Sequence, residues 1–381
     1  MRTIFIVSGI HRKGRIGMDR NEVTYLSGTA SMPFKGTTHR QIVELAKWTD
    51  LLCEEALEPD LPIIDPHHHV WDDERGRYMS SELMHDLSSG HRIESTVFVQ
   101  FKSGYRKEGP PSMQPVGEVE FARSFADACE IQNPGGPRVC EGIIAHADLT
   151  LGDEVQPVLD AMAEAGGERL KGIRHGATWD SGSAGYGRTF ARPHLLSDAT
   201  FRRGFARLIP PGLTFDAWLF YPQLPDLVSL LHDYPDASVV LDHAGGVLGV
   251  DPHTDRAAVF DAWRENMKRV AGYPNVTVKI GGLGMLYAGW DFHLCDRPPS
   301  SNDLAVCWRP YVETCIELFG PERCMFESNF PVDKQSCGYG VLWNAFKRIT
   351  ERFSPSEKLA LYSGTAARTY RLHRPIELTQ S

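Results

Sequence analysis

The sequence predicts a closed (β/α)8 barrel, the TIM barrel, and three observations lead to this fold class. Eight short apolar runs rich in β-branched residues alternate with stretches of helical periodicity. Such alternation is typical of parallel strands joined by helices. The chain has 381 residues, a length that these barrels reach with insertions. No Gly-rich fingerprint follows the first strand, so the alternative, a doubly wound open sheet, is less well supported.

The predicted elements follow one another along the chain from about residue 38. A helical pattern over 38–58 leads into the first strand, which begins at Leu61 and ends in His67, His68 and His69. The seven later strands are predicted over 93–100, 139–149, 170–175, 213–220, 238–243, 276–282 and 324–330. Helices are predicted over 118–131, 155–165, 201–208, 224–232, 256–270, 308–319, 341–350 and 355–370. The last helix begins with a capping box formed by Ser354 and Glu357.

Composition limits the kind of protein that this can be. Residues 1–37 lack sustained periodicity and are expected to form an extension of uncertain order, while 38–381 form a single barrel domain. With 42% hydrophobic and 23% charged residues, the chain can build a large core. The net charge of −9 argues against nucleic acid as a partner, and no apolar run is long enough to span a membrane. Eight scattered cysteines indicate reduced thiols in a cytoplasmic protein, and a homo-oligomer stays open.

The histidines after the first strand are the strongest functional signal. Side chains alternate along a strand, so His67 and His69 share one face and His68 takes the other. At roughly 3.3 Å per residue, the two rings lie about 6.6 Å apart and can converge on one ion or substrate. The alternative is a hydrogen-bonded turn without function.

Polar residues also end the other predicted strands. Because active sites of such barrels lie at the carboxyl ends of the strands, these residues are expected to converge on one rim. The set comprises Gln100, His146, Arg174, His175, Asp216, His243, Lys279, Glu327 and Asn329. Tyr105 and Arg106, on the loop after the second strand, can clamp an anionic substrate, and the loop over 178–192 is suited to cover a pocket. For His146 and His175 a purely structural role is the alternative.

These motifs together resemble the amidohydrolase superfamily. They are H-x-H on the first strand, I-R-H on the fourth, L-D-H-x-G-G on the sixth and S-N-F-P on the eighth. Within that superfamily, the chain looks most like the amidohydrolase-2 branch, which contains pyrone-dicarboxylate and sugar lactonases. The resemblance covers about residues 61–372.

The resemblance implies roles for several residues. His67, His69 and His243 would hold a single divalent ion, zinc most often, or polarise a substrate carbonyl directly, because some lactonases work without metal. Arg174 would pair with a carboxylate of the substrate, with Gln100, Asp216, His146 and His175 around it. The expected partner is therefore a small molecule, anionic or polyhydroxylated.

The chain departs from the family at the eighth strand. Members usually carry an Asp there that deprotonates the attacking water, but this position is Asn329, whose amide cannot act as a base. Glu327 lies two residues earlier on the same face, and we hypothesise that it replaces the missing carboxylate while Asn329 orients water or substrate. A structural salt bridge between Glu327 and Lys279 is the alternative.

The sequence therefore predicts a hydrolase that opens a cyclic ester or amide, most simply a lactone bearing a carboxylate or hydroxyls. Two alternatives stay open. Related barrels decarboxylate aromatic or enoic acids without an oxidant, and the change to Asn329 also allows a catalytically silent barrel that binds a small acid.

Overall fold

The computed structural model describes residues 40, 42–74, 76–182, 184 and 191–373. The predicted extension over 1–37 lies outside the described residues, as does most of the second half of the loop over 178–192. Among the described residues of the predicted helix over 38–58, α2 (Ile42–Thr49) is the helical part, and the chain from 52 to 56 is irregular. Among the described residues, no helix is both long and apolar enough to cross a membrane.

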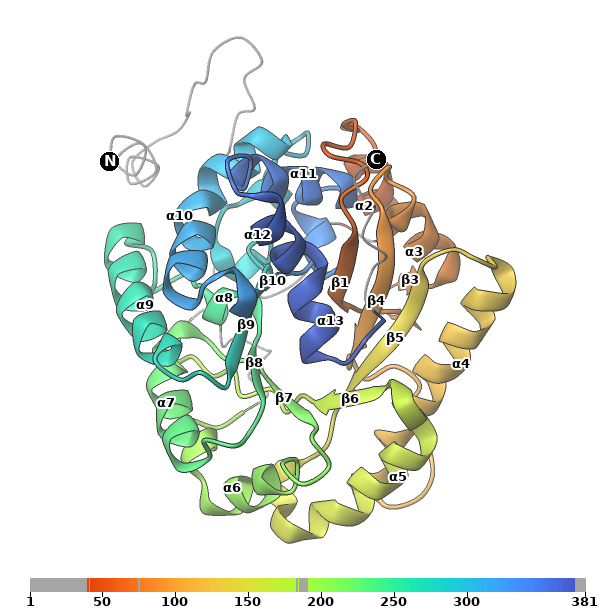
Figure 1. Cartoon of the computed structure of the whole chain (residues 1–381), viewed down its shortest axis with the longest axis vertical. Helices are drawn as coiled ribbons and strands as arrows, with labels where there is room; N and C mark the ends of the chain where they lie inside the picture. Colours follow the sequence, from red (N-terminus) through yellow and green to blue (C-terminus); the bar gives the residue numbers. More distant parts are fainter. Residues whose placement is uncertain (1–39, 41, 75, 183, 185–190, 374–381) are drawn as a thin grey trace.

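Eight parallel strands form one sheet in the order of the chain, which confirms the predicted barrel (Figure 1). The strands are β1 (Ile63–His68), β4 (Ile93–Val99), β5 (Arg138–Ala145), β6 (Leu170–Ile173), β7 (Thr214–Ala217), β8 (Val239–Leu241), β9 (Val276–Ile280) and β10 (Cys324–Phe326). Each lies inside a predicted strand or within one residue of it, but all eight end one to four residues earlier than predicted. A small antiparallel hairpin of β2 (Trp71–Asp73) and β3 (Gly76–Tyr78), which the sequence did not indicate, follows β1.

Contacts between the first and last strands close the ring. The Asn329 amide donates to the His67 carbonyl at 2.9 Å, and the His69 amide donates to the Phe330 carbonyl at 2.8 Å. The Ser328 hydroxyl adds a bond of 2.6 Å to the Asp65 carboxylate, which is fully buried in the seam. The closure therefore holds the residues after β10 beside the histidines of β1.

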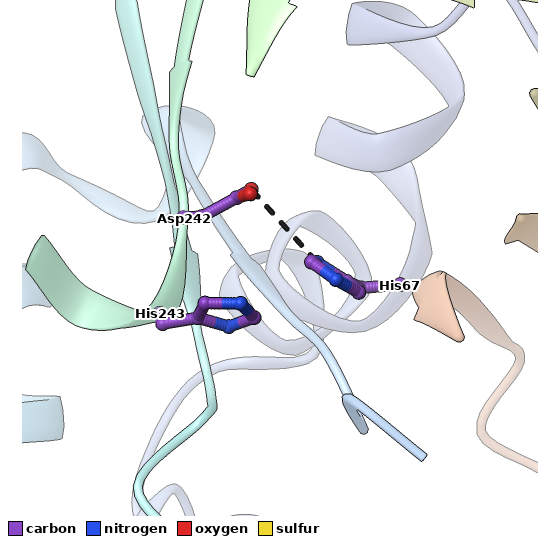
Figure 2. A group of neighbouring side chains, drawn as sticks. All are labelled: His67, Asp242 and His243. Atoms are coloured by element: carbon purple, nitrogen blue, oxygen red, sulfur yellow. Dashed lines mark ion pairs between the residues drawn. The ribbon is translucent and has the colours of Figure 1, made fainter. Parts of the chain in front are cut away.

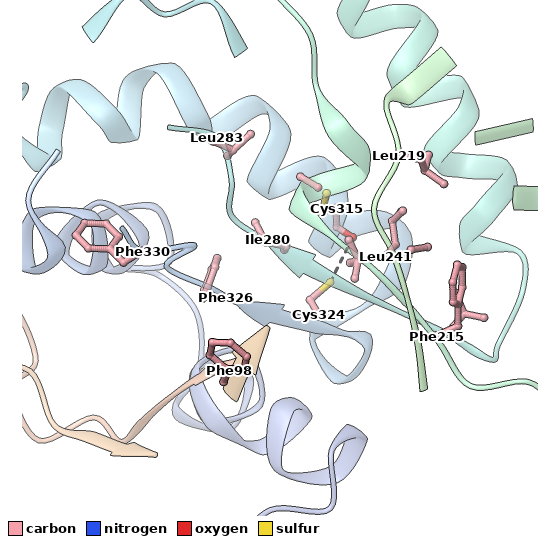
Figure 3. Close-up of a cluster of buried hydrophobic side chains, with 14 of the residues drawn as sticks. Phe98, Phe215, Leu219, Leu241, Ile280, Leu283, Cys315, Cys324, Phe326 and Phe330 are labelled. Carbon is pink, nitrogen blue, oxygen red and sulfur yellow. Dashed lines mark hydrogen bonds between the residues drawn. The ribbon is translucent and has the colours of Figure 1, made fainter. Parts of the chain in front are cut away.

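Helices surround the sheet, and buried apolar side chains fill the layer between them. The helices are α3 (Ser80–Leu87), α4 (Val116–Gln132), α5 (Gln156–Gly166), α6 (Ala199–Ala206), α7 (Leu224–Asp233), α8 (His243–Gly246), α9 (Arg256–Ala271), α10 (Ser301–Phe319), α11 (Tyr339–Ile349), α12 (Pro355–Leu359) and α13 (Thr365–Thr369). Figure 3 shows part of this layer, with Phe98 from β4, Phe326 from β10 and Cys315 from α10 packed together. All eight cysteines are free thiols, and six are buried.

The C-terminal segment has two features that follow from its sequence. The Ser354 and Glu357 side chains form the predicted capping box at the start of α12. A π-helical turn over Ala360–Gly364 then interrupts the single predicted helix before α13. As a result α13 lies over the centre of the barrel in Figure 1, where Tyr370 is fully buried.

Candidate active site

The two histidines that share a face of β1 lie in the centre of the barrel, and both are almost fully buried. Nδ1 of His69 lies 2.7 Å from the Val99 carbonyl, so it must carry the proton, and Nε2 keeps its lone pair. His68 takes the opposite face, where its Nε2 lies 2.9 Å from the Thr96 hydroxyl. Burial lowers the pKa of His67 and His69 well below the usual range, and Arg174 contributes to both shifts, so both rings are neutral.

His67 lies between a guanidinium and a carboxylate, which fixes its tautomer. Arg174 approaches Nε2 of His67 at 3.2 Å, and a guanidinium can only donate. Nε2 is therefore the acceptor, and Nδ1 carries the proton. Oε2 of Glu327 lies 2.7 Å from Nδ1, within ion-pair distance but without the geometry of a hydrogen bond.

His243 completes the central group from the end of β8. Its ring centroid lies 4.5 Å from that of His67, and the two rings are drawn together in Figure 2. Nδ1 of His243 donates to Oε1 of Glu327 at 2.7 Å, so Nε2 is unprotonated and carries a lone pair. Its backbone has φ 55°, a left-handed conformation that a non-glycine residue adopts at a cost and that often marks a functional site.

Glu327 therefore bridges two imidazoles, with one carboxylate oxygen toward each, and it is fully buried. The structural alternative paired Glu327 with Lys279. Lys279 instead forms ion pairs with Asp216 at 2.8 Å and with Asp242 at 3.1 Å. The carboxylate of Glu327 thus lies where the hypothesis needs it, but its catalytic role stays a prediction.

Asn329, at the position of the family Asp, is also buried and left-handed, with φ 55°. Its amide nitrogen donates to Oδ1 of Asp333 at 2.8 Å, and Oδ2 of Asp333 accepts the Gly284 amide at 2.9 Å. Burial raises the pKa of Asp333 to about 7. A carboxylate thus lies directly behind Asn329, and the only sequence signal for it is the spacing of four residues.

Lys279 and Asp242 lie beside the histidines. Nζ of Lys279 is 3.4 Å from Nδ1 of His67, and both Lys279 and Asp242 are fully buried. Burial acts to lower the pKa of Lys279, but Asp216 and Asp242 raise it overall, so the lysine is charged. Burial acts to raise the pKa of Asp242, but neighbouring cationic groups, Lys279 foremost, lower it overall.

Among the described residues, one group has the spacing of metal ligands: His67, Asp242 and His243, with ligand atoms within 4.8 Å of one another (Figure 2). Oδ1 of Asp242 is buried and has no hydrogen-bond donor of good geometry, although it lies within ion-pair distance of Lys279. Imidazole nitrogens and a carboxylate oxygen are ligands that a divalent ion takes, so the donor set fits one once Arg174 no longer donates to Nε2 of His67. His69, which the sequence placed in the metal set, lies outside this group.

The predicted substrate-binding residues differ in their position relative to the central histidines. Arg174, 4% exposed, donates to the Gln100 carbonyl at 2.7 Å and to Asp242 at 3.4 Å, so it is at the centre, where Gln100 contributes its backbone. Asp216 is fully buried on β7 beneath the histidines. Tyr105 keeps a buried hydroxyl that has no hydrogen-bond partner, and burial raises its pKa.

The remaining three predicted residues lie away from the central group. Arg106 is at the surface, where its guanidinium pairs with Glu120. Nδ1 of His146 bonds to the Arg174 carbonyl at 3.1 Å. Nδ1 of His175 accepts the Leu149 amide at 3.1 Å, and its ring packs against Phe201 of α6. Both histidines thus form hydrogen bonds with backbone groups near the strand ends, and their roles in substrate binding stay predictions.

Sequence reasoning missed three residues of the site. Asp242 directly precedes His243, and this adjacency was the available signal. For Asp333, the only signal in the sequence was its spacing from Asn329. The ring of Trp218, which follows β7, meets the His243 ring edge-on at a centroid distance of 4.6 Å. No pattern in the sequence distinguishes this tryptophan from one of the core.

Comparison with known proteins gives the class to which this site belongs. The sequence profile of the amidohydrolase family, in its second branch, matches residues 64–372, and the chain belongs to this family. It is a hydrolytic enzyme, as the sequence predicted.

Individual relatives narrow the class further. The chain is 33% identical to the uncharacterized protein y4mH of Sinorhizobium fredii, over 82% of this chain and 99% of that protein. It is 30% identical to an L-fucono-1,5-lactonase of Burkholderia multivorans, over 57% of this chain and 68% of that enzyme. The second of these relatives supports a hydrolase of small molecules.

Solved structures share the fold. An amidohydrolase of Burkholderia multivorans with bound HEPES superposes with a TM-score of 0.61 at 24% identity, covering 82% of this chain and 99% of that one. A second crystal form of an amidohydrolase from that organism, with bound zinc, gives 0.60 at 24% identity. The likeness supports the barrel.

Proposed function

We propose that this enzyme opens the ring of a lactone by adding water to its carbonyl carbon. The observation that carries the proposal is the pair formed by His243 and Glu327. One side of the imidazole donates to a buried carboxylate at 2.7 Å, and the other side keeps a lone pair. A histidine oriented in this way can take a proton from water, while the carboxylate stabilises the imidazolium that forms.

The other residues have roles that follow from their charge. As the hydroxyl attacks, negative charge develops on the carbonyl oxygen, and Arg174 is the cation available to stabilise it or to pair with a carboxylate of the substrate. Collapse of the tetrahedral intermediate breaks the bond to the ring oxygen, which takes the proton from His243. We favour Glu327 as the carboxylate that replaces the family Asp, acting through His243 and His67, both of which lie 2.7 Å from it.

We extend the proposal to a form with a single divalent ion, with zinc as the expected metal. His67, Asp242 and His243 would hold it, and His69 stays a predicted further ligand. In that form Nε2 of His243 would be a ligand, so it would no longer be the group that takes the proton from water. When bound, the ion supplies Lewis-acid polarisation of the carbonyl group. Elemental analysis of protein purified without chelator is expected to give about one metal ion per chain. Less than a tenth of that, with activity unchanged by a chelator, would remove the ion from the proposal.

The test of function is a panel of five- and six-membered sugar lactones and a pyrone carboxylate, followed by release of protons at constant pH. We expect ring opening of at least one lactone with saturation kinetics. Candidate aromatic acids are assayed in parallel for carbon dioxide. Release of carbon dioxide without lactone opening supports a decarboxylase, and a compound that raises the melting temperature yet is recovered unchanged supports a binding protein.

A further inference from the structure

The segment around α13 fills the inside of the barrel from the side opposite the histidines. Its side chains form one apolar cluster with inward-facing residues of the strands. The cluster comprises Ile64, Val97, Val99, Ile144, Val240, Met325, Ala366, Ala367, Tyr370 and Leu372. In Figure 1, α13 accordingly lies over the centre of the ring of strands. Only Tyr370 brings a polar atom into this cluster, and it is fully buried.

The Tyr370 hydroxyl begins a continuous line of polar contacts that reaches the histidines. It donates to Oδ2 of Asp216 at 2.5 Å. The same oxygen accepts from Nζ of Lys279 at 2.8 Å. Lys279 in turn lies 3.1 Å from Oδ1 of Asp242 and 3.4 Å from Nδ1 of His67.

The physical reason that this line matters is the burial of its charges. Asp216 and Lys279 are both fully buried, so neither can replace a lost partner with water. The other oxygen of Asp216 accepts from the Thr214 hydroxyl at 2.9 Å, and Tyr370 supplies the donor that completes the carboxylate. Without that donor, we expect Asp216 to attract the ammonium group of Lys279 more strongly, so that Lys279 moves away from Asp242 and His67.

We propose that Tyr370 is a positioning residue of the active site, acting through Asp216 and Lys279 to fix the ammonium group beside His67 and Asp242. Its effect on activity rests on the proposed function, whereas its effect on His67 does not. The competing explanation is that Tyr370 only fills space in the barrel.

A matched control exists elsewhere in the chain. Tyr78 donates to Asp86 at 2.7 Å, and Asp86 pairs with Lys334 at 2.6 Å. All three are buried, as Tyr370, Asp216 and Lys279 are, but within the described part of the chain this second group forms no hydrogen bond or ion pair with the histidines of the site. Removing one hydroxyl from each group therefore tests the connection rather than the loss of a buried bond.

The experiment compares Tyr370→Phe with Tyr78→Phe in the full chain. With ¹⁵N-labelled histidine, the imidazole signals of His67 are identified by their loss in His67→Gln. We expect these signals to shift in Tyr370→Phe and to stay in place in Tyr78→Phe, at similar melting temperatures. With the lactone found in the panel, kcat is expected to fall about tenfold in Tyr370→Phe with KM within about twofold, since a lost bond to a charged group has that order of effect.

The outcomes separate the two proposals. Unchanged His67 signals in Tyr370→Phe, or equal shifts in both variants, would overturn the positioning role. Shifted His67 signals without any lactone turnover would support the positioning role and count against the proposed reaction. If Tyr370→Phe does not fold, Asp216→Asn is measured against Asp86→Asn by the same signals, with the same expected difference.

Discussion

Two groups of the same chemical kind, each a buried tyrosine, aspartate and lysine, lie in different parts of the molecule. In the barrel, Lys279 lies 5.3 Å from the centroid of the Tyr370 ring, and near α3 Lys334 lies 5.7 Å from that of Tyr78. They differ in what the lysine touches. Lys334 gives both of its bonds, 2.6 and 2.7 Å long, to the single carboxylate of Asp86.

Lys279 instead divides its contacts between two carboxylates and the His67 imidazole. Asp86 lies on α3 and Lys334 in the short turn after β10, so the second group fastens a helix to the barrel. The comparison teaches that a buried ion pair by itself indicates little about function. The relevant observation is whether one of its members has a further contact that reaches reactive groups.

Replacing the two lysines gives the largest expected difference. Lys279→Met and Lys334→Met each leave buried carboxylates uncompensated, so both are expected to lose about 3 kcal/mol of stability. Only Lys279→Met is expected to lose activity per folded molecule, by roughly a thousandfold, because the charge beside His67 is lost. Urea unfolding and initial rates measure the two effects. An equal loss of kcat in both variants would mean that the lysines are alike after all.

The second prediction concerns Glu327, the carboxylate that lies beside His67, as Lys279 of the barrel group does. In Glu327→Gln, a neutral amide replaces the carboxylate that accepts from Nδ1 of His243 and lies within ion-pair distance of His67. We expect kcat to fall about a hundredfold, in line with the loss of an orienting carboxylate behind a histidine. Asp86→Asn is the matched control, because it too neutralises a buried carboxylate. Retained turnover in Glu327→Gln would contradict both its predicted role and the pair with His243.

The smallest effect comes from a third buried lysine, Lys347, which forms no ion pair within 4 Å with a carboxylate of the described residues. It donates to the carbonyls of Leu57 and Glu58, and it lies 2.9 Å from Nδ1 of His91. Burial, with a contribution from Lys347, lowers the pKa of His91 from 6.5 to about 4. Because the unfolded chain binds this proton at higher pH than the folded one, the stability from neutral His91 is present above pH 6.5 and is lost as the pH falls toward 4.

Over that range the loss is expected to be about 1 kcal/mol per pH unit, measured as the urea midpoint at pH 7 and pH 5. His91→Gln should remove this contribution and make the dependence shallower, since other buried histidines still contribute, and His194→Gln, at an exposed position, should leave it unchanged. An unchanged slope in His91→Gln would show that this buried pair does not respond to acid.

The sequence was sufficient for the strands and for the central residues because both depend on local patterns. Alternating β-branched runs marked all eight strands, and the alternation of side chains placed His67 and His69 on the inner face. The rule that strand ends converge brought His243, Arg174 and Glu327 to the same place. The hairpin of β2 and β3 was not predicted, because three-residue strands leave too short a pattern.

Other parts of the site depend on contacts that no local pattern contains. The pairing of Lys279 with Asp216 and Asp242, rather than with Glu327, follows from the register of neighbouring strands. The position of Asp333 behind Asn329 depends on the left-handed turn at Asn329. Whether His175 faces inward or toward Phe201 is likewise decided by packing, since Arg174 beside it takes the inward direction.

The placement of Tyr370 has a practical consequence for anyone who handles this enzyme. A truncation that removes Tyr370 would also remove the hydrogen-bond donor of a carboxylate deep in the barrel.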